Sequence, residues 1–370
     1  MAKKKKTSVA IIYNHFGEDI YEKIRKVDPD SLGFEPEYDI DVATVTEEYE
    51  AIAKALRGEG YNVYILNINE DINVLINLLQ NNPPDVVFNL IEFYREDPAL
   101  EHLVAGLFAL YGVRFTGARP FTLALCQRKG MTKQLLLANN VPTPRYRLLS
   151  EPKLPGRHGL HYPLIVKPAR EDASSGVEKG SVVYNSEELS ERINKAFAEY
   201  NPPILVEEFI EGRELHVSVL GNDPPEVLPI IEFDFSELPS DHPTIISYDA
   251  KWNPLEESFH RVHSICPAKL TRRVEKKVKA AVLDAYKITG CTDYARLDLR
   301  LTKDNKVYVL EVNPNPDLTE SVSFMESAEQ IGLSFGETLA KIVEFALNRP
   351  APSIPVLQPA SEKTTSTKNK

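Results

Sequence analysis

The segment from Arg296 to Asn313 constrains the fold of this 370-residue chain more tightly than any other stretch. Two runs in which polar and apolar residues alternate flank Lys303-Asp304-Asn305-Lys306, four residues that favour a turn. Because successive side chains of a strand point to opposite faces, the pattern predicts an antiparallel hairpin with one apolar face. In the first strand three leucines would lie on the apolar face and three charged residues on the other, namely Leu297, Leu299 and Leu301 against Arg296, Asp298 and Arg300.

The second strand divides in the same way under strict alternation, with Tyr308, Leu310 and Val312 on one face and Val307, Val309, Glu311 and Asn313 on the other. A symmetric turn of two or four residues would set Asp298 opposite Glu311 and Arg296 opposite Asn313. Directly opposed carboxylates destabilise a sheet unless a cation compensates them. Two carboxylates and an amide offer the hard oxygen ligands that Mg²⁺ prefers, alongside phosphate oxygens and water.

The hairpin therefore predicts a divalent-ion site that handles a nucleotide. The alternative interpretation is a solvated strand face on which Arg296 or Arg300 simply neutralises the acids.

Strand and helix patterns alternate in the first third of the chain, which predicts an open, mostly parallel sheet and an α/β fold class. The predicted strands are Val9 to Tyr13, Val63 to Ile68 and Asp85 to Asn89. A helix before the second strand would bury Tyr49, Ile52, Ala53 and Leu56, and Thr44 with Glu47 forms a candidate capping box.

The rest of the chain predicts two α+β parts after a helical stretch and the extended segment Val141-Pro142-Thr143-Pro144. Strands at Leu164 to Val166, Gly180 to Tyr184 and Ile204 to Glu207 surround a helix from Ser186 to Tyr200. A helix from Ala268 to Thr289, the hairpin and a helix after Glu326 follow. We divide the chain into domains at 1–120, 121–215 and 216–350, and the Pro-, Ser-, Thr- and Lys-rich tail 351–370 predicts disorder.

Composition excludes several classes of protein. A net charge of -11 argues against a nucleic-acid partner, because phosphate binding needs surplus lysine and arginine. No apolar run approaches the ~20 residues that span a bilayer. Cys126, Cys266 and Cys291 lack a CxxC spacing, so neither a disulfide framework nor a zinc site is predicted, and a cytoplasmic location fits best.

Six motifs in one order resemble the D-alanine–D-alanine ligases and together extend from about Val9 to Arg349. The first motif is Ala295-Arg296-Leu297-Asp298 followed by Leu310-Glu311-Val312-Asn313-Pro314, which is similar to the metal-binding end of these ligases. The other five are Phe115-Thr116-Gly117 with Arg128-Lys129 and Lys133, Ile165-Val166-Lys167-Pro168, Ser174-Ser175-Gly176-Val177, Val206 to Glu214, and Tyr248-Asp249-Ala250-Lys251-Trp252. Each motif is weak alone, but their shared order makes chance an improbable explanation.

The resemblance implies the ATP-grasp fold behind an N-terminal parallel-sheet domain, with ATP and Mg²⁺ (or Mn²⁺) as cofactors. Lys129 and Lys167 would contact the phosphates, and the loop at Ser174 would cradle them with backbone amides. The adenosine would be bound by Glu207, Glu208, Phe209, Ile210, Glu214 and Leu310, with Glu214 on the ribose and Leu310 beneath the adenine. Asp298, Glu311 and Asn313 would hold the metal. Without such roles, Lys129, Lys133 and Lys251 would be ordinary surface lysines.

The implied reaction is ATP-dependent ligation of a carboxylate and an amine. The carboxylate attacks the γ-phosphate to give an acyl phosphate and ADP, and the amine then attacks the acyl carbon. Arg296 would stabilise the oxyanion, and the segment from Ser247 to Pro254, which carries Lys251, would close over the site as a lid. The partners would be amino acids or short peptides, and a homodimer is compatible with the resemblance.

The sequence departs from the family on the substrate side. Ala173 and Trp252 replace a serine and a tyrosine, Asn89-Leu90-Ile91-Glu92 replaces a His-Gly pair, and Asp317 replaces a glycine. No counterpart of an early glutamate is evident, and Ser321 and Ser323 lie beside the acceptor-carboxylate position. We therefore expect altered substrates. The alternatives are a true D-alanine–D-alanine ligase, a nonenzymatic ATP-binding regulator, and a ligase with a thiol or bicarbonate acceptor.

Overall fold

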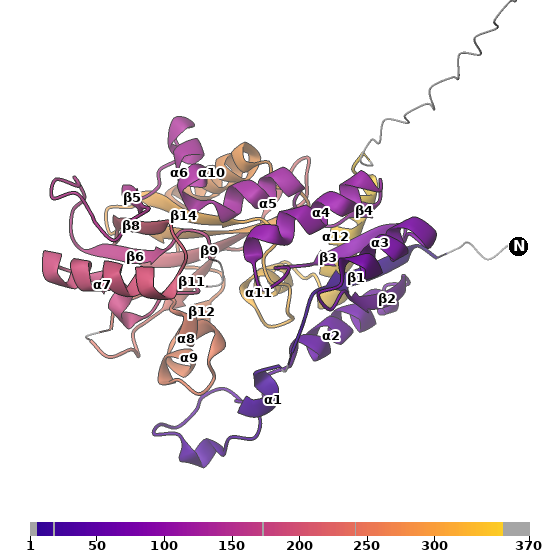
Figure 1. Cartoon of the computed structure of the whole chain (residues 1–370), viewed down its shortest axis with the longest axis horizontal. Coiled ribbons are helices and arrows are strands. Elements are labelled where there is room, and N and C mark those ends of the chain that lie inside the picture. The colour runs from indigo at the N-terminus through magenta and orange to yellow at the C-terminus, as the bar shows by residue number, and fades with distance from the viewer. Residues whose placement is uncertain (1–5, 18, 172–173, 241, 351–370) are drawn as a thin grey trace, which may run out of the picture.

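The computed structural model describes residues 6–17, 19–171, 174–240 and 242–350, which form three sheets with helices packed around them (Figure 1). Ala173 lies outside the described residues, and so does the tail 351–370, which was predicted to be disordered. Within the described ranges, no helix is both long enough and apolar enough to cross a bilayer.

The N-terminal part is a four-stranded parallel sheet in the order β2-β1-β3-β4, which confirms the predicted open sheet. Its elements are β1 (Ser8–Tyr13), α2 (Val45–Gly58), β2 (Asn62–Asn67), α3 (Ile72–Asn81), β3 (Val86–Leu90), α4 (Glu101–Leu110) and β4 (Arg114–Phe115). Helix α2 begins at the predicted capping box of Thr44 and Glu47. The long segment between β1 and α2 carries the short helix α1 (Tyr21–Ile24) and extends below the sheet in Figure 1.

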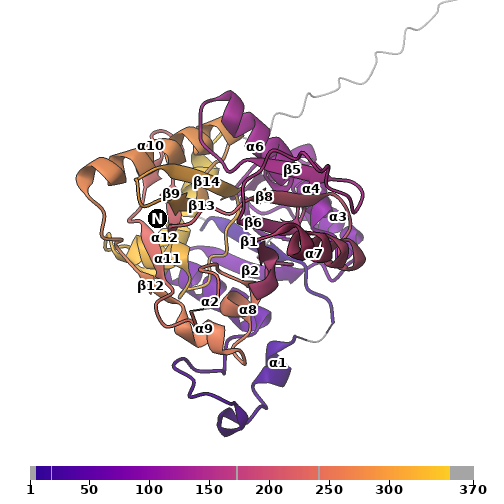
Figure 2. The same cartoon turned by 90° about the vertical axis from the view of Figure 1, so that its left-hand side faces the viewer.

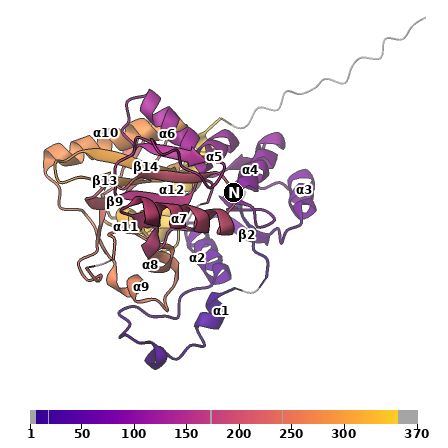
Figure 3. The ribbon, with the colours of Figure 1, turned by 60° about the vertical axis from the view of Figure 1, so that its left-hand side comes forward.

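The middle part is an antiparallel sheet in the order β5-β8-β6-β7. Its elements are β5 (Tyr146–Leu149), β6 (Leu164–Pro168), β7 (Val182–Val183), α7 (Ser186–Glu199) and β8 (Ile204–Glu208). Helix α7 covers one face, where its Leu189 and Ile193 pack against Val166 and Val206 (Figures 2 and 3). The other face of β6 and β8 carries Lys167 and Glu207 and remains for the site.

The third sheet has the order β12-β11-β9-β13-β14, with β10 paired to β9. Its strands are β9 (Arg213–Leu220), β10 (Glu226–Val227), β11 (Ile231–Asp234), β12 (His263–Ile265), β13 (Tyr294–Leu301) and β14 (Val307–Asn313). Helix α10 (Arg272–Thr289) packs its Val278 and Val282 against one face, as Figure 2 shows above β13 and β14. The polar face of β9, β13 and β14 is turned to the opposite side.

The last two helices, α11 (Ser323–Glu329) and α12 (Phe335–Asn348), return to the N-terminal sheet. Ile342 and Val343 of α12 share a core with Ile52 and Leu56 of α2. The predicted ranges do not anticipate this return, and residue 215 lies inside β9 rather than between elements. The division at 120, 215 and 350 otherwise stays a prediction.

The helical stretch predicted after Gly117 is two helices, α5 (Pro120–Gln127) and α6 (Lys129–Ala138), which meet at Arg128. The segment 141–144 is extended as predicted, and Val309 N of β14 donates a 2.8 Å hydrogen bond to Pro142 O. This path brings Lys129 and Lys133 of α6 between the middle and third sheets.

Candidate active site

A cavity with about 870 Å³ of empty space lies between the middle and third sheets. It is lined by thirteen of the fourteen predicted site residues, namely Lys129, Lys167, Ser174, Glu207, Glu208, Phe209, Ile210, Glu214, Lys251, Arg296, Asp298, Leu310 and Glu311. The remaining one, Asn313, lines an adjoining cavity. Side chains predicted from separate motifs thus lie together, while their individual roles stay predictions.

The hairpin has the predicted pairing, with Asp298 opposite Glu311 and Arg296 opposite Asn313. The turn is not symmetric, however, because Thr302 N bonds to Lys306 O and Asn305 adopts a left-handed conformation with φ of 61°. A bulge between Asp298 and Leu299 in the register then adds one residue to β14.

The bulge changes the predicted faces of β14. Val307 and Val309 pack in the core with Val312, whereas strict alternation placed Val312 on the other face. Leu310 lines the cavity together with Glu311, its neighbour in the chain. The alternation was wrong because one extra residue inverts the pattern at this point, and this inversion places Leu310 in the cavity.

Asp298 is buried and Glu311 is partly buried, so the solvent-exposed face of the alternative interpretation is wrong, whereas its pairing of Arg296 with an acid is confirmed. Arg296 binds Asp298 through two hydrogen bonds, Nε to Oδ1 at 2.8 Å and Nη2 to Oδ2 at 3.0 Å. Lys129 Nζ lies 3.4 Å from Glu311 Oε2. Burial alone would raise the pKa of Glu311, but Lys129, Lys167 and Arg296 together outweigh it and the pKa is lowered. The carboxylate of Glu311 is therefore held ionised beside cations.

Strand β9 contributes polar side chains that the sequence prediction missed in part. Its Glu214 and His216 lie opposite Arg300 and Asp298 of β13. His216 Nε2 is 3.5 Å from Asp298 Oδ1, and burial followed by Arg296 lowers the pKa of His216 well below its usual value. The sequence signal for His216 was that polar residues alternate with apolar ones at Glu214, His216 and Ser218. This pattern indicates a site only when β13 is known to pair with β9.

Glu207 lies between two lysines. Its Oε1 is 2.7 Å from Lys167 Nζ and its Oε2 is 2.7 Å from Lys133 Nζ. Burial would raise the pKa of Glu207, but the two lysines lower it. Lys133 is 1% exposed and Lys129 6%, so neither is an ordinary surface lysine. Lys133 does not line the cavity itself and contacts it through Glu207.

The loop after β6 closes against the segment that carries Lys251. Ser174 Oγ donates to Ile246 O at 3.2 Å, and Tyr248 N donates to Val177 O at 2.9 Å. Gly176 has φ of 71°, and an added Cβ would lie 2.7 Å from the Pro168 ring. The loop therefore requires glycine there to approach β6 closely.

Lys251 lies on helix α8 (Tyr248–Trp252), within the segment predicted to be a lid, and its ammonium is 4.7 Å from the centroid of the Trp252 ring. Burial, followed by Arg296, lowers the pKa of Lys251 to about 8. The segment before α2 reaches this region, since the Tyr21 hydroxyl donates to Trp252 O at 3.2 Å (Figures 1 and 3). Tyr38 N likewise donates to His260 Nδ1 of α9 (Glu257–Arg261) at 3.1 Å.

A second cavity adjoins the first, and a third cavity adjoins the second. Lys129, Lys251, Arg296 and Glu311 line both the first cavity, named the nucleotide cavity below after its proposed role, and the second cavity, which also contains Asn313. We call this second space the substrate cavity; its wall includes the departures Glu92, Trp252 and Asp317. A third cavity shares those three residues and adds Glu48 of α2, which the sequence prediction missed. The sequence contains only one indication that Glu48 lies near the site, namely its position directly after the capping-box residue Glu47.

The two serines near the acceptor position differ in their surroundings. Ser321 is exposed, whereas Ser323 Oγ lies 3.1 Å from His216 Nδ1 at the start of α11. Ser323 thus contacts the site through His216. Among the described residues, none of the three cysteines forms a disulfide.

Comparison with known proteins identifies the family. The family model for the D-ala D-ala ligase C-terminus matches residues 147–344. The D-alanine–D-alanine ligase of Carboxydothermus hydrogenoformans is 33% identical over 308 residues, which cover 80% of this chain and 92% of the relative. The uncharacterized protein y4sG of Sinorhizobium fredii is 29% identical over 307 residues, covering 81% and 87%.

The D-alanine–D-alanine ligase from Bacillus anthracis has the same fold, with a TM-score of 0.70 at 22% sequence identity and coverage of 92% of this chain and 97% of that one. Its complex with ATP gives a TM-score of 0.69 at 21% identity, with the same coverage. These comparisons confirm the predicted resemblance and the ATP-grasp fold, and they give no support to a nonenzymatic regulator. The chain belongs to the D-alanine–D-alanine ligase family and is an ATP-dependent carbon–nitrogen ligase.

Proposed function

We propose that this ligase joins a carboxylate and an amine other than two molecules of D-alanine, through an acyl phosphate. One observation carries the proposal: the nucleotide and substrate cavities meet at Lys129, Lys251, Arg296 and Glu311. A phosphate from the first cavity and a carboxylate in the second would therefore react beside one acid and three cations.

The donor set of the hairpin fits a divalent cation. Asp298 and Glu311 face each other on paired strands, and Asn313 supplies an amide oxygen at the edge of the substrate cavity. We propose that these three residues hold Mg²⁺ or Mn²⁺. When bound, the ion would neutralise charge on the phosphoryl oxygens.

The other predicted site residues would have separate roles in the reaction. Lys129 and Lys167 would bind phosphate oxygens as point charges, and both already lie at the cavity wall. Arg296, fixed by its two bonds to Asp298, would stabilise the oxyanion formed when the amine attacks the acyl carbon. Helix α8 with Lys251 would exclude water, because an acyl phosphate hydrolyses readily.

The residues around the substrate cavity support a substrate other than D-alanine. The residues that line the substrate cavity include Glu92, Asp317 and Trp252, three departures from the family's pattern, beside residues that match it on the ATP side. Glu48 lies next to them, and we propose that its carboxylate binds the ammonium of the carboxylate substrate. A larger or more cationic amino acid than D-alanine fits such a wall.

The test is an ADP-release screen over pairs of carboxylates and amines, with D-alanine as sole substrate included as the reference. We expect ADP release with a pair other than D-alanine and little with D-alanine alone. Robust ADP release from D-alanine as sole substrate would contradict the proposal. Hydroxamate formation with hydroxylamine, compared with a thiol acceptor, separates an amine ligase from a thiol ligase.

A further inference from the structure

The third cavity is roomy and its wall is mostly apolar. It contains about 1100 Å³ of empty space and opens into the substrate cavity, with which it shares Glu92, Trp252, Asn315 and Asp317. Five aromatic residues line it, namely Tyr21, Tyr49, Tyr248, Trp252 and Tyr294. Since the methyl side chain of alanine would occupy only a small part of such a space, the cavity fits a larger group.

The positions at which this sequence departs from the family meet in the wall of the third cavity. Asn89-Leu90-Ile91-Glu92, Trp252 and Asp317 come from three distant parts of the chain, and all of them line it. Ala173, the other replaced position, lies outside the described residues. Leu90 and Ile91 are aliphatic and Trp252 is aromatic, so three of the replacements supply apolar surface. The changes are therefore concentrated where a group absent from D-alanine would bind.

Two of the five rings are held in place by aromatic neighbours. Tyr49 packs against Tyr13 with ring centroids 4.6 Å apart, and Tyr294 packs edge-on against Phe324 at 5.7 Å. Aromatic side chains offer a large apolar area and have few rotatable bonds. Rings that are fixed in this way form a wall that needs little rearrangement to bind an apolar group.

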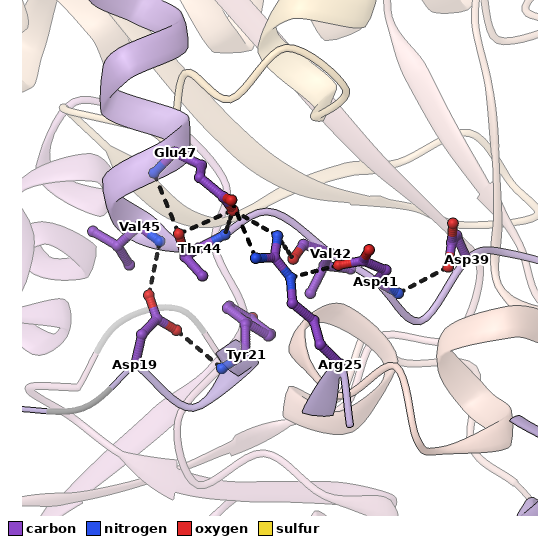
Figure 4. Close-up of polar contacts among 9 residues, drawn as sticks. All are labelled: Asp19, Tyr21, Arg25, Asp39, Asp41, Val42, Thr44, Val45 and Glu47. Carbon is purple, nitrogen blue, oxygen red and sulfur yellow. Dashed lines mark hydrogen bonds and ion pairs between the residues drawn. The ribbon is translucent and has the colours of Figure 1, made fainter. Parts of the chain in front are cut away.

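Hydrogen bonds tie the outer wall of the third cavity to α2. Asp19 accepts hydrogen bonds from Tyr21 N at 2.9 Å and from Val45 N at 2.8 Å, as Figure 4 shows. The Tyr21 hydroxyl in turn donates to Trp252 O at 3.2 Å. Because Tyr21, Val45 and Trp252 all line the cavity, these bonds fix its outer boundary.

The acids of this wall leave no place for a cationic side chain. Asp317 interacts electrostatically with both Lys251 and Arg296, so cations of the enzyme already balance it. Glu92 is exposed to solvent. Glu48 is the residue that we propose binds the α-ammonium group of the substrate. The side chain of the substrate therefore needs no positive charge.

Asn89 gives a further reason to exclude a cationic side chain. It is 1% exposed and lines the third cavity, and among the described residues its Nδ2 has no hydrogen-bond acceptor. Buried donors rarely stay unpaired, so this amide calls for an acceptor atom. An ammonium group has donors only, whereas a phenol oxygen can accept a hydrogen bond.

Resting on the proposed function, we propose that the carboxylate substrate is an amino acid with a bulky, uncharged and mainly apolar side chain, which the third cavity binds. The substrate carboxylate would lie toward Arg296 and Lys251 in the substrate cavity, with the α-ammonium group beside Glu48. The side chain would then be buried between Tyr49 and Tyr294. Burial of apolar surface selects the substrate, because each buried methylene is worth roughly fourfold in affinity.

The test uses hydroxylamine as the acceptor, because it displaces phosphate from the acyl phosphate and leaves a hydroxamate whatever the natural amine is. Hydroxamate and ADP are measured in both enantiomers for alanine, 2-aminobutyrate, norvaline and norleucine, and for methionine, phenylalanine and tyrosine. Two pairs of similar size, norleucine with lysine and leucine with asparagine, separate apolar contact from size. We expect kcat/KM for at least one bulky apolar amino acid to exceed that of alanine, and of its polar counterpart, about tenfold or more.

The variant Val45→Phe narrows the third cavity from its outer wall. It should lower kcat/KM for the bulky substrate at least about tenfold and bring its ratio to alanine close to one. Val74→Phe is the matched control, the same substitution at a valine of α3 that is 37% exposed and does not line the cavity, and it should retain the ratio. Thermal unfolding checks that each variant is folded, and the wild-type series tests the inference without any variant.

The outcomes separate the inference from the function on which it rests. Equal or better use of alanine by the wild type, or equal use of lysine and norleucine, would overturn the inference and leave the ligase function intact. An unchanged ratio in folded Val45→Phe would overturn the assignment of the third cavity. Absence of hydroxamate with any carboxylate, D-alanine and dipeptides included, would overturn the proposed function as well.

Discussion

Asp298 and Glu311 lie directly opposite each other on β13 and β14, and the bulge beside them turns Leu310 into the same cavity as Glu311. Two opposed acids would destabilise a simple hairpin, yet here Arg296 binds one and Lys129 approaches the other. The pairing of two acids, each beside a cation, is therefore typical of a functional site, and the bulge adds the apolar side chain of Leu310 to its wall.

Replacement of Leu310 by alanine should weaken ATP binding about tenfold, because the loss of a packed leucine side chain removes roughly 1.5 kcal/mol or more of apolar contact. The measurement is ATP titration by calorimetry. Val309→Ala, which truncates the neighbour on the core side, is the matched control: it should lower the unfolding temperature instead, since Val309 packs under α10. Equal ATP affinity in wild type and Leu310→Ala would contradict the placement of the adenine.

Arg296→Lys keeps the charge but loses the planar pair of bonds to Asp298. We expect kcat to fall by roughly 10²–10³, the usual effect of losing an oxyanion donor. The dissociation constant of ATP should change much less, because Lys129 and Lys167 remain. Steady-state ADP release gives kcat, and an ATP titration gives the dissociation constant. A variant with normal kcat would exclude Arg296 from the chemical step.

Lys133→Met should destabilise the protein by about 3–5 kcal/mol, because it leaves Glu207 buried with Lys167 alone. Unfolding in urea measures this change. Lys279→Met removes an exposed ion pair with Glu275 and should change stability by less than about 1 kcal/mol. Similar effects of both substitutions would show that the buried trio is not a structural unit.

Glu48 predicts a pH dependence of stability in the ligand-free enzyme. Its folded pKa of about 8 lies above the usual carboxyl value of 4.5, so the folded state favours the protonated form. The stabilisation is present at low pH and is lost as the pH rises through 8, since the carboxylate must then be buried beside Asp317, Glu92 and Asp19.

Glu48→Gln should therefore raise the unfolding temperature at pH 9 relative to the wild type and have little effect at pH 5. Differential scanning calorimetry at the two values gives the comparison. Glu47→Gln should do the opposite and destabilise at pH 9, because Arg25 lowers the pKa of Glu47. Stabilisation by Glu48→Gln at pH 5 but not at pH 9 would refute the assignment.

The sequence predicts the parallel sheet and the hairpin pairing because both depend on local periodicity and turn residues. Strict alternation gives the wrong face at Leu310, because a bulge inserts one extra residue that the two-residue period of a strand cannot predict. It also undervalues His216, whose polarity matters only once β13 lies beside β9. The meeting of Glu48 with Asp317 depends on the packing of α2 against the segment after β14, and no local pattern contains it.

The most direct test of the central claim is the formation of ADP and acyl hydroxamate by the wild type and by Glu311→Ala, at increasing Mg²⁺ and with hydroxylamine as acceptor. The wild type should form both products in equal amounts, only with a carboxylate and Mg²⁺ present. Glu311→Ala, confirmed as folded by its unfolding temperature, should lose at least about 100-fold in rate. Unchanged product formation by Glu311→Ala would contradict the assignment of this hairpin as the centre of the reaction.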